Sequence, residues 1–365
     1  MQSDFLIDYY SDQDISPFQL NKLNRLLRQD LENSNLDSAG KKVDIIGKMI
    51  ASQDLDSNLL AESLYYTGIY YKLKDDFSLC RKYLEKVITI KENIGKVDTI
   101  YSKALYNLGG LFARLGLYKL HETYTLKALD AEKLLYGERS AELISTYGSL
   151  ITAYIELNES RKALGLTEIA YETASLNETK ARPSDLAFMY NNIGVLHSSL
   201  RDYSKSLVFF DKAEEIFSRS EYAVNELLIN LYRNKSTALS ILGKTDEAEI
   251  YFNKAIKLAL TDYSRSAYLQ LSDYAQRLAK SGQIKTGASI MTNLIDRIEK
   301  RTSRDSLDYF DVLVLYAEFL RQYDIENQEA LRCYERSISF FERHGDQFLN
   351  FEAAIGKALI LQESG

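Results

Sequence analysis

Residues 105–129 read "LYNLGGLFARLGLYKLHETYTLKAL", and residues 190–214 read "YNNIGVLHSSLRDYSKSLVFFDKAE". Residues 64–88, "LYYTGIYYKLKDDFSLCRKYLEKVI", align with both stretches. Each stretch begins with Leu or Tyr, has Gly four residues later, and has an aromatic residue or His three residues beyond the glycine. Weaker copies at residues 147–171 and 232–256 keep this frame but carry Ile151 and Ser236 in place of the glycine. Self-similarity at a fixed spacing is the sequence signature of a repeat protein.

The small residue of each copy belongs to a column that continues through two further copies, which begin at Leu271 and Leu313. The column consists of Gly68, Gly109, Ile151, Gly194, Ser236, Ala275 and Ala317. Consecutive members of this column are 39 to 43 residues apart. We therefore predict seven repeats of nearly constant length.

The composition predicts that these repeats are helical. Only two prolines occur in 365 residues, and the rest of the chain is rich in Leu, Ala, Lys, Glu, Ile and Tyr. Most of these residues are strong helix formers, so the composition is typical of an all-α protein. Gly116, Gly243 and Gly282 each lie seven residues after the small-residue column. We expect a turn between two helices there, because such turns often need a residue with positive φ.

The pattern resembles the tetratricopeptide repeat (TPR), a helix–turn–helix unit of roughly 34 residues. The likeness is carried by Leu105, Gly109 and Phe112 in a first helix, and by Ala248 and Ala255 in a second helix. The tryptophan and the closing proline that are usual in the family are absent. About eight extra residues per repeat add roughly two helical turns. Such long repeats resemble those of kinesin light chains, of bacterial peptide-sensing Rap regulators, and of the region before caspase-like CHAT protease domains.

The resemblance implies an all-α fold, a right-handed α-α superhelical solenoid of TPR-like helix hairpins, in a bacterial protein. We expect residues 1–56 to form a degenerate helical cap, in which Pro17 begins a helix. Residues 57–345 would hold the seven repeats, and residues 346–365 the first helix of an eighth. Ala358 continues the small-residue column 41 residues after Ala317. The sequence thus stops at the hinge of an eighth repeat, from which we expect the chain to be the front part of a longer protein.

Charge and cysteine content exclude several classes of function. The formal net charge is −7, and no block of Lys and Arg stands out, which argues against nucleic acid and against anionic membranes. The acidic N-terminus has no apolar run of the kind found in a signal peptide, and no window is apolar enough to span a membrane. Two distant cysteines, Cys80 and Cys333, do not form a disulfide framework. We therefore predict a cytoplasmic protein.

No fragment of the sequence assembles a catalytic site. The "GKT" of residues 243–245 has Ala238 where a phosphate-binding loop needs glycine. The "HE" of residues 121–122 has Thr125 where a zinc-peptidase helix needs a second histidine. His121 and His197 occupy packing positions of the repeat, and Cys80 stands where other repeats carry Ala, so all three are expected to be buried. We predict a non-enzymatic chain with no catalytic residue, cofactor or metal.

Asparagines recur in the first helices, although Asn is a mediocre helix former. With the small residue as position eight, the resemblance places positions near two, five, six, nine, twelve and thirteen on the concave face. Position five is occupied by Tyr65, Tyr106, Gly148, Asn191, Arg233 and Ser272. Position six is occupied by Tyr66, Asn107, Ser149, Asn192, Asn234 and Asp273. Amides offer donors and acceptors to a peptide backbone, and arginine binds carboxylates in bidentate fashion.

These columns give the predicted groove for a peptide or protein segment. It consists of Tyr65, Tyr66, Tyr106, Asn107, Asn191, Asn192, Arg233, Asn234 and Gln276. A second interpretation stays open, in which each Asn bonds to the neighbouring repeat and holds the superhelix in register.

Two functional hypotheses follow. The first is a scaffold or adaptor that binds a peptide or protein segment, expected to be basic in part because the chain is acidic. The second is the regulatory, sensor region of a larger CHAT-type protease, whose partners would be a C-terminal effector domain or a protease. A Rap-like peptide-sensing regulator is a third option, although the sequence shows no extended N-terminal helical bundle.

Overall fold

The computed structural model describes residues 17–52, 55–74, 76–218, 225–262, 264–301, 307–344 and 347–364. Within these ranges the chain forms seventeen α-helices and one 3-10 turn, and no strand. The first six helices are α2 (Pro17–Glu32), α3 (Leu36–Ser52), α4 (Ser57–Leu73), α5 (Phe77–Asn93), α6 (Thr99–Arg114) and α7 (Tyr118–Tyr136). The 3-10 turn η1 (Ala141–Leu143) and the other helices follow: α8 (Ile144–Glu156), α9 (Ser160–Leu176), α10 (Pro183–Ser199), α11 (Tyr203–Ser218), α12 (Asn225–Ile241), α13 (Thr245–Ala259), α14 (Arg265–Lys280), α15 (Ile284–Arg301), α16 (Leu307–Gln322), α17 (Asn327–His344) and α18 (Gln347–Ser364).

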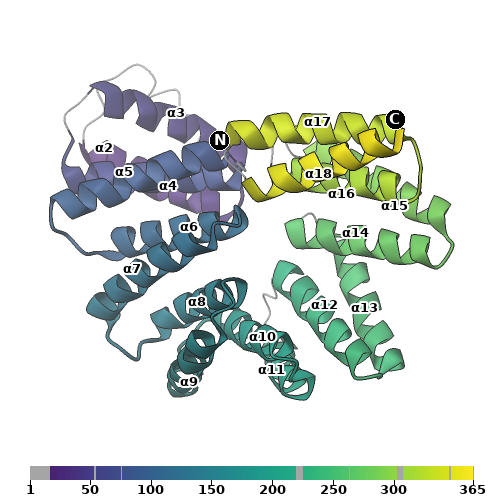
Figure 1. The fold of residues 1–365 in the computed structure, drawn as a ribbon. Coiled ribbons are helices and arrows are strands. Elements are labelled where there is room, and N and C mark those ends of the chain that lie inside the picture. The colour runs from purple at the N-terminus through teal and green to yellow at the C-terminus, as the bar shows by residue number, and fades with distance from the viewer. Residues whose placement is uncertain are drawn as a thin grey trace. The chain divides into compact units, whose positions relative to one another are not determined.

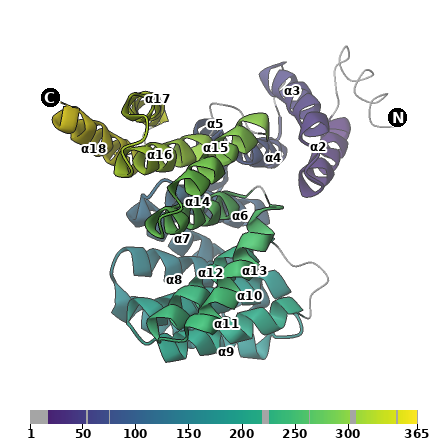
Figure 2. The same cartoon turned by 90° about the vertical axis from the view of Figure 1, so that its right-hand side faces the viewer.

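The helices pack as consecutive pairs. The two helices of a repeat lie side by side in α4–α5, α10–α11, α12–α13, α14–α15 and α16–α17 (Figures 1 and 2). The first helix of each repeat also contacts the first helix of the next, in the order α8, α10, α12, α14, α16 and α18. The predicted fold class, an all-α solenoid of TPR-like helix pairs, is therefore confirmed, and so is the helix start at Pro17.

The chain divides into two compact parts. The N-terminal part consists of residues 1–114 and 123–137, and the C-terminal part consists of residues 115–122 and 138–365. In the N-terminal part, α2 and α3 bury Leu20, Leu27 and Ile46 against α4. In the C-terminal part, Phe210 and Phe319 are completely buried at the centres of two further clusters. Each part therefore has its own apolar core.

Close helix packing explains the small-residue column. A Cβ atom added to Gly194 would lie 2.4 Å from a ring carbon of Phe210 on the partner helix α11. Ser236 donates a hydrogen bond from Oγ to the carbonyl oxygen of Ala248 on α13, at 2.8 Å. Two helices approach closely only where a small side chain on one leaves room for a side chain of the other. The small-residue column therefore marks the crossing points of the helix pairs.

A second column marks the turns between the helices of each pair. Gly116, Gly243 and Gly282 have φ angles of +68°, +76° and +92°, as predicted. Six residues with positive φ lie seven positions after the small-residue column: Gly116, Asn158, Arg201, Gly243, Gly282 and Asp324. Asn and Asp tolerate the left-handed conformation better than most residues, which makes them workable substitutes for glycine at this site.

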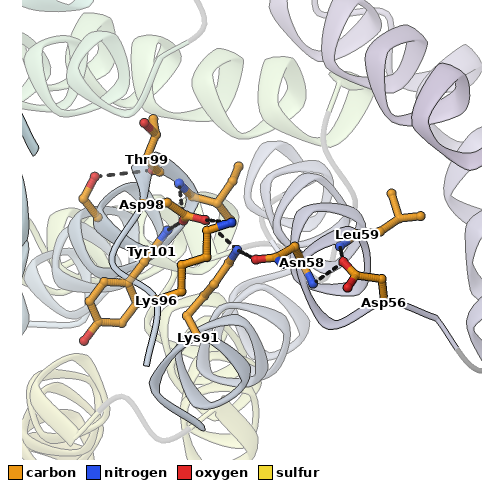
Figure 3. A network of polar contacts seen from close by, with 10 residues as sticks. Asp56, Asn58, Leu59, Lys91, Lys96, Asp98, Thr99 and Tyr101 are labelled. Carbon is orange, nitrogen blue, oxygen red and sulfur yellow. Dashed lines mark hydrogen bonds and ion pairs between the residues drawn. The ribbon is translucent and has the colours of Figure 1, made fainter. Parts of the chain in front are cut away.

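A buried lysine links the first two repeats of the N-terminal part (Figure 3). The Lys91 side chain is only 2% exposed, and its Nζ donates to Asn58 Oδ1 at 3.0 Å and to Asp98 Oδ2 at 2.7 Å. Asp98 Oδ1 in turn accepts the backbone N–H of Tyr101 at 3.1 Å, in the first turn of α6. Burial alone would raise the pKa of Asp98, but the Lys91 ammonium and the Tyr101 N–H hold this pKa below its usual value. The starts of α4 and α6 are thus tied to one ammonium group at the end of α5.

Helix α18 covers the first helix of the last repeat with one face. It buries Ala353, Gly356 and Ile360 and contacts α16 and α17. Its other face carries Phe351, which is 65% exposed, together with exposed Ile355, Ala358 and Leu361. Ala358, the residue predicted to continue the small-residue column, therefore has no helix packed against it among the residues described.

Candidate functional site

An asparagine ladder crosses three successive repeats of the C-terminal part. Asn192 on α10 is buried and donates from Nδ2 to the carbonyl oxygen of Gly148 on α8, at 3.0 Å. Asn191 donates from Nδ2 to Asn192 Oδ1 at 3.2 Å, and Asn234 on α12 donates from Nδ2 to Asn191 Oδ1 at 3.2 Å. The first and last of these bonds join neighbouring repeats, and the Asn191–Asn192 bond connects them within α10. The ladder corresponds to the second interpretation of the asparagines, in which they connect neighbouring repeats.

A hollow of about 460 Å³ lies at the end of this ladder. Its lining residues come from five helices of the C-terminal part: Val195, Ser198, Phe210, Arg233, Asn234, Thr237, Leu269, Ser272, Asp273, Gln276, Arg277 and Leu315. Most of these side chains carry an amide, hydroxyl or charged group, and only four are aliphatic or aromatic. The hollow therefore offers hydrogen-bonding groups, although the larger share of its exposed surface is apolar.

Arg233 has an unusual electrostatic position in this hollow. Its side chain is partly buried, and its guanidinium makes no hydrogen bond or ion pair with any residue that the structure describes. Burial lowers the pKa of Arg233, Asp273 raises it, and Arg265 lowers it again. The carboxylates nearby are already engaged, because Arg277 Nε donates to Asp273 at 3.1 Å and Arg265 Nε donates to Asp311 at 2.5 Å. A partly desolvated guanidinium without a counter-ion favours an anion from outside.

The predicted residues of the N-terminal part have partners of their own. Asn107 Nδ2 donates to the hydroxyl of Tyr65 at 3.3 Å and to the carbonyl oxygen of Lys103 at 2.9 Å, while its Oδ1 accepts from Lys72 Nζ at 2.7 Å. Tyr65 is buried, and this burial raises its pKa. The polar atoms of Asn107 therefore join α4 to α6.

The rings of this part are packed as well. The ring of Tyr66 meets that of Tyr65 edge-on at 5.3 Å and packs against the cluster formed by α2 and α3. Tyr106 is half-buried.

The nine predicted groove residues are distributed over both compact parts of the chain. Tyr65, Tyr66, Tyr106 and Asn107 lie in the N-terminal part, and the other five lie in the C-terminal part. Only Arg233, Asn234 and Gln276 line the hollow. Sequence reasoning missed Thr237 and Arg277, which also line it. Thr237 had a usable signal, since it occupies position nine of its repeat as Gln276 does in the next.

The residues expected to pack inside the repeats do so. His121, His197 and Cys80 are at most 4% exposed. His121 Nε2 lies 2.9 Å from Ser149 Oγ, and burial lowers the pKa of His121 to about 4. His197 stacks on Phe209 with ring centroids 5.4 Å apart. These three side chains are parts of the core.

The described residues contain neither a metal-binding cluster nor a membrane-spanning helix. No group of three or more His, Cys, Asp or Glu side chains comes together there in a way that suits a metal ion. Within the same ranges, no helix combines the length and the apolar character that crossing a membrane requires.

Two sequence comparisons find similarity over short segments. Residues 185–261 match the tetratricopeptide repeat family. Photosystem I assembly protein Ycf3 of Rippkaea orientalis is 28% identical over 100 residues, which are 26% of this chain and 56% of that protein. The match thus spans little more than half the length of that curated relative.

Comparison with solved structures finds likeness over most of the chain. NprR in complex with its cognate peptide NprX superposes with a TM-score of 0.61 and 14% identity, covering 88% of this chain and 87% of that one. A Rap protein complexed with competence and sporulation factor gives a TM-score of 0.60 and 19% identity, covering 93% and 90%. At these identities the likeness shows a shared fold.

Proposed function

We propose that this chain, part of which matches the tetratricopeptide repeat family, is a non-catalytic scaffold or adaptor that binds a peptide or protein segment in the hollow of its C-terminal part. The unpaired guanidinium of Arg233 is the observation that carries this proposal. It would hold an acidic side chain or a terminal carboxylate of the segment through paired hydrogen bonds.

The other groups of the hollow suit an extended segment. Asn234 and Gln276 lie on α12 and α14. Thr237 lies beside them, and its hydroxyl is left as an acceptor because it already donates to the carbonyl oxygen of Arg233. Such side chains hydrogen-bond the N–H and C=O groups of an extended backbone, which otherwise stay unpaired when they leave water. Solved structures of the same fold hold NprX, a peptide, in the case of NprR, and competence and sporulation factor in the case of a Rap protein. This precedent supports a peptide or protein partner here.

The test compares partners retained by three immobilised chains: wild type, Arg233→Ala, and the control Arg161→Ala. Arg161 is an exposed arginine on α9, outside the hollow, so its removal changes the net charge equally. We expect a partner that wild type and Arg161→Ala retain and Arg233→Ala loses. Arg233→Lys keeps the positive charge but loses the planar guanidinium and its paired N–H donors. We therefore expect this variant to recover binding only in part.

A second step locates the bound group. Synthetic peptides that tile the retained partner are titrated with free and with amidated C-termini. Loss of binding on amidation assigns Arg233 to a terminal carboxylate, whereas loss on Asp or Glu replacement assigns it to a side chain. Equal retention of all partners by Arg233→Ala would contradict the proposal. Nothing in the described residues favours the regulatory region of a CHAT-type protease over this function, and that hypothesis stays a prediction.

A further inference from the structure

A second hollow, of about 710 Å³, lies in the N-terminal part and is bounded by α3, α4 and α5. Its apolar lining comes from Ile50, Leu60, Leu64 and Ile90. Leu64 is 4% exposed, and the other three are half-buried. The groove is therefore floored by aliphatic side chains that no other described element covers completely.

One edge of this groove is basic. Arg81, Lys82, Glu85 and Lys86 of α5 all line it. Arg81 Nε is 2.8 Å from Glu85 Oε1, so this pair is neutral as a whole. Lys82 and Lys86 are exposed, and neither forms an ion pair with a residue that the structure describes. Two uncompensated positive charges thus lie beside an apolar floor, on a chain whose formal net charge is −7.

The spacing of Lys82 and Lys86 determines how the charged residues of a bound helix must be spaced. Residues four apart on a helix lie on the same face, about 6 Å apart. A second helix that runs along α5 and carries carboxylates four residues apart would face both ammonium groups at once. Leu60 and Leu64 of α4 are also four residues apart, so the floor repeats with the same period as the edge.

The aliphatic floor favours one conformation of the bound segment, although Ser78 and Thr89 also line the groove. An extended segment lying on Ile50, Leu60, Leu64 and Ile90 would leave backbone N–H and C=O groups without partners, and each such group costs free energy when buried. A helix satisfies its own backbone and presents only side chains. We propose that this groove binds an acidic amphipathic helix of a partner protein, with its apolar face on the floor and its carboxylates toward Lys82 and Lys86. This surface is independent of the hollow around Arg233, whose polar lining suits an extended segment.

The test uses two fluorescein-labelled helical peptides of about 18 residues, or five turns. Both carry the same Leu stripe, and one has Glu at every charged position where the other has Lys. Anisotropy titration of the full chain should give at least about tenfold tighter binding of the Glu peptide, since attraction to both lysines is replaced by repulsion in the Lys peptide. The preference should weaken as salt is raised, because exposed pairs are screened.

The charge-reversed chain Lys82→Glu with Lys86→Glu should lose this preference. Lys205→Glu with Lys257→Glu is the matched control, because these lysines are exposed, lie on α11 and α13, and change the net charge equally. Circular dichroism of each variant confirms that the helices are intact. Equal affinity for both peptides, or an unchanged preference in the Lys82/Lys86 variant, would overturn the proposal.

Residues 1–16 offer a competing occupant, because they contain four Asp and no Lys or Arg. A chain that begins at Pro17 is therefore titrated in parallel. A tenfold rise in affinity for the Glu peptide in that chain would show that the groove serves the protein's own N-terminus, and would overturn the proposal of an external partner. An unchanged affinity supports the partner helix. Neither result bears on Arg233, so the two proposals fail separately.

Discussion

Gly194→Ala provides the sharpest test of the repeat frame. The added methyl carbon would lie 2.4 Å and 2.5 Å from Cε1 and Cδ1 of Phe210, whereas nonbonded carbons keep about 3.5–4.0 Å apart. Phe210 is completely buried, although it also lines the hollow around Arg233, so its ring must shift to admit the methyl group. Replacing Gly by Ala inside a helix gains about 1 kcal/mol of helix propensity, and overpacking costs about 1–3 kcal/mol. An overlap larger than 1 Å puts the packing cost at the upper end. We expect a net destabilisation of about 2 kcal/mol.

The chain supplies a control of opposite sign. At Gly110, in the interior of α6, an added Cβ meets nothing within 4 Å. Gly110→Ala should therefore stabilise the protein by about 0.5–1 kcal/mol. Urea unfolding gives both changes, and hydrogen exchange of α10 and α11 amides locates the Gly194 effect, because repeats open locally. Phe210→Leu should partly rescue Gly194→Ala by removing the ring edge. If Gly194→Ala and Gly110→Ala were equally stable, α10 and α11 would not approach each other as closely as the structure shows.

Three further outcomes follow from buried polar groups. Burial raises the thiol pKa of both Cys80 and Cys333 to about 12. Neither thiol should therefore react with an aromatic disulfide reagent until urea unfolds the chain. Rapid labelling of the native protein would contradict their burial. Lys91→Met removes the closer of two ammonium groups from Asp98 and should cost about 2 kcal/mol. This is less than the roughly 3–5 kcal/mol of a fully buried pair, because Asp98 is partly exposed and Lys96 Nζ stays 3.8 Å from its Oδ2. The folded-state pKa of Asp98 is lowered, so its contribution to the free energy of unfolding is present above its unfolded pKa of about 3.9 and is lost as pH falls. The urea midpoint of the wild type should therefore fall more steeply in acid than that of Lys91→Met. Parallel plots of urea midpoint against pH for the two chains would count against this ion pair. Asn192→Ala removes the donor to the Gly148 carbonyl and should cost about 1–3 kcal/mol, and a wild-type melting temperature would show that this bond does not hold the repeats together.

The fold could be predicted from the sequence because each helix crossing and each turn requires a particular type of residue. Close approach at Gly194 demands a small residue, and the turn at Gly243 demands positive φ, so both recur at a fixed interval. The same interval places Asn158, Arg201 and Asp324 at turns, yet residue type alone did not reveal them. Their backbone conformation is imposed by the two helices that each turn joins, which is a property of the pair and not of the turn residue.

The asparagines show where sequence reasoning about the site stops. A column at one repeat position identifies side chains that share a face, but it does not say whether their hydrogen bonds go to a neighbour or to a ligand. Asn192 bonds to the preceding repeat, whereas Arg233, one position earlier in the next repeat, has no partner among the described residues. The difference comes from Asp273, which is close enough to influence Arg233 but is bonded to Arg277. Such competition among three side chains depends on distances that the sequence does not contain.

Net charge was equally uninformative about the two surfaces. A formal charge of −7 led to the expectation of a partly basic partner, yet both hollows present unpaired positive groups. Screening over about 10 Å makes a bound segment respond to the charges beside it and not to the sum over the chain. The linings then separate the two binding modes. Around Arg233 the amides can pair with an extended backbone, whereas beside Lys82 the aliphatic floor favours a segment that has already paired its own backbone groups. Single substitutions at Lys82 and at Arg233 should therefore act independently, each weakening only the binding of the segment beside it.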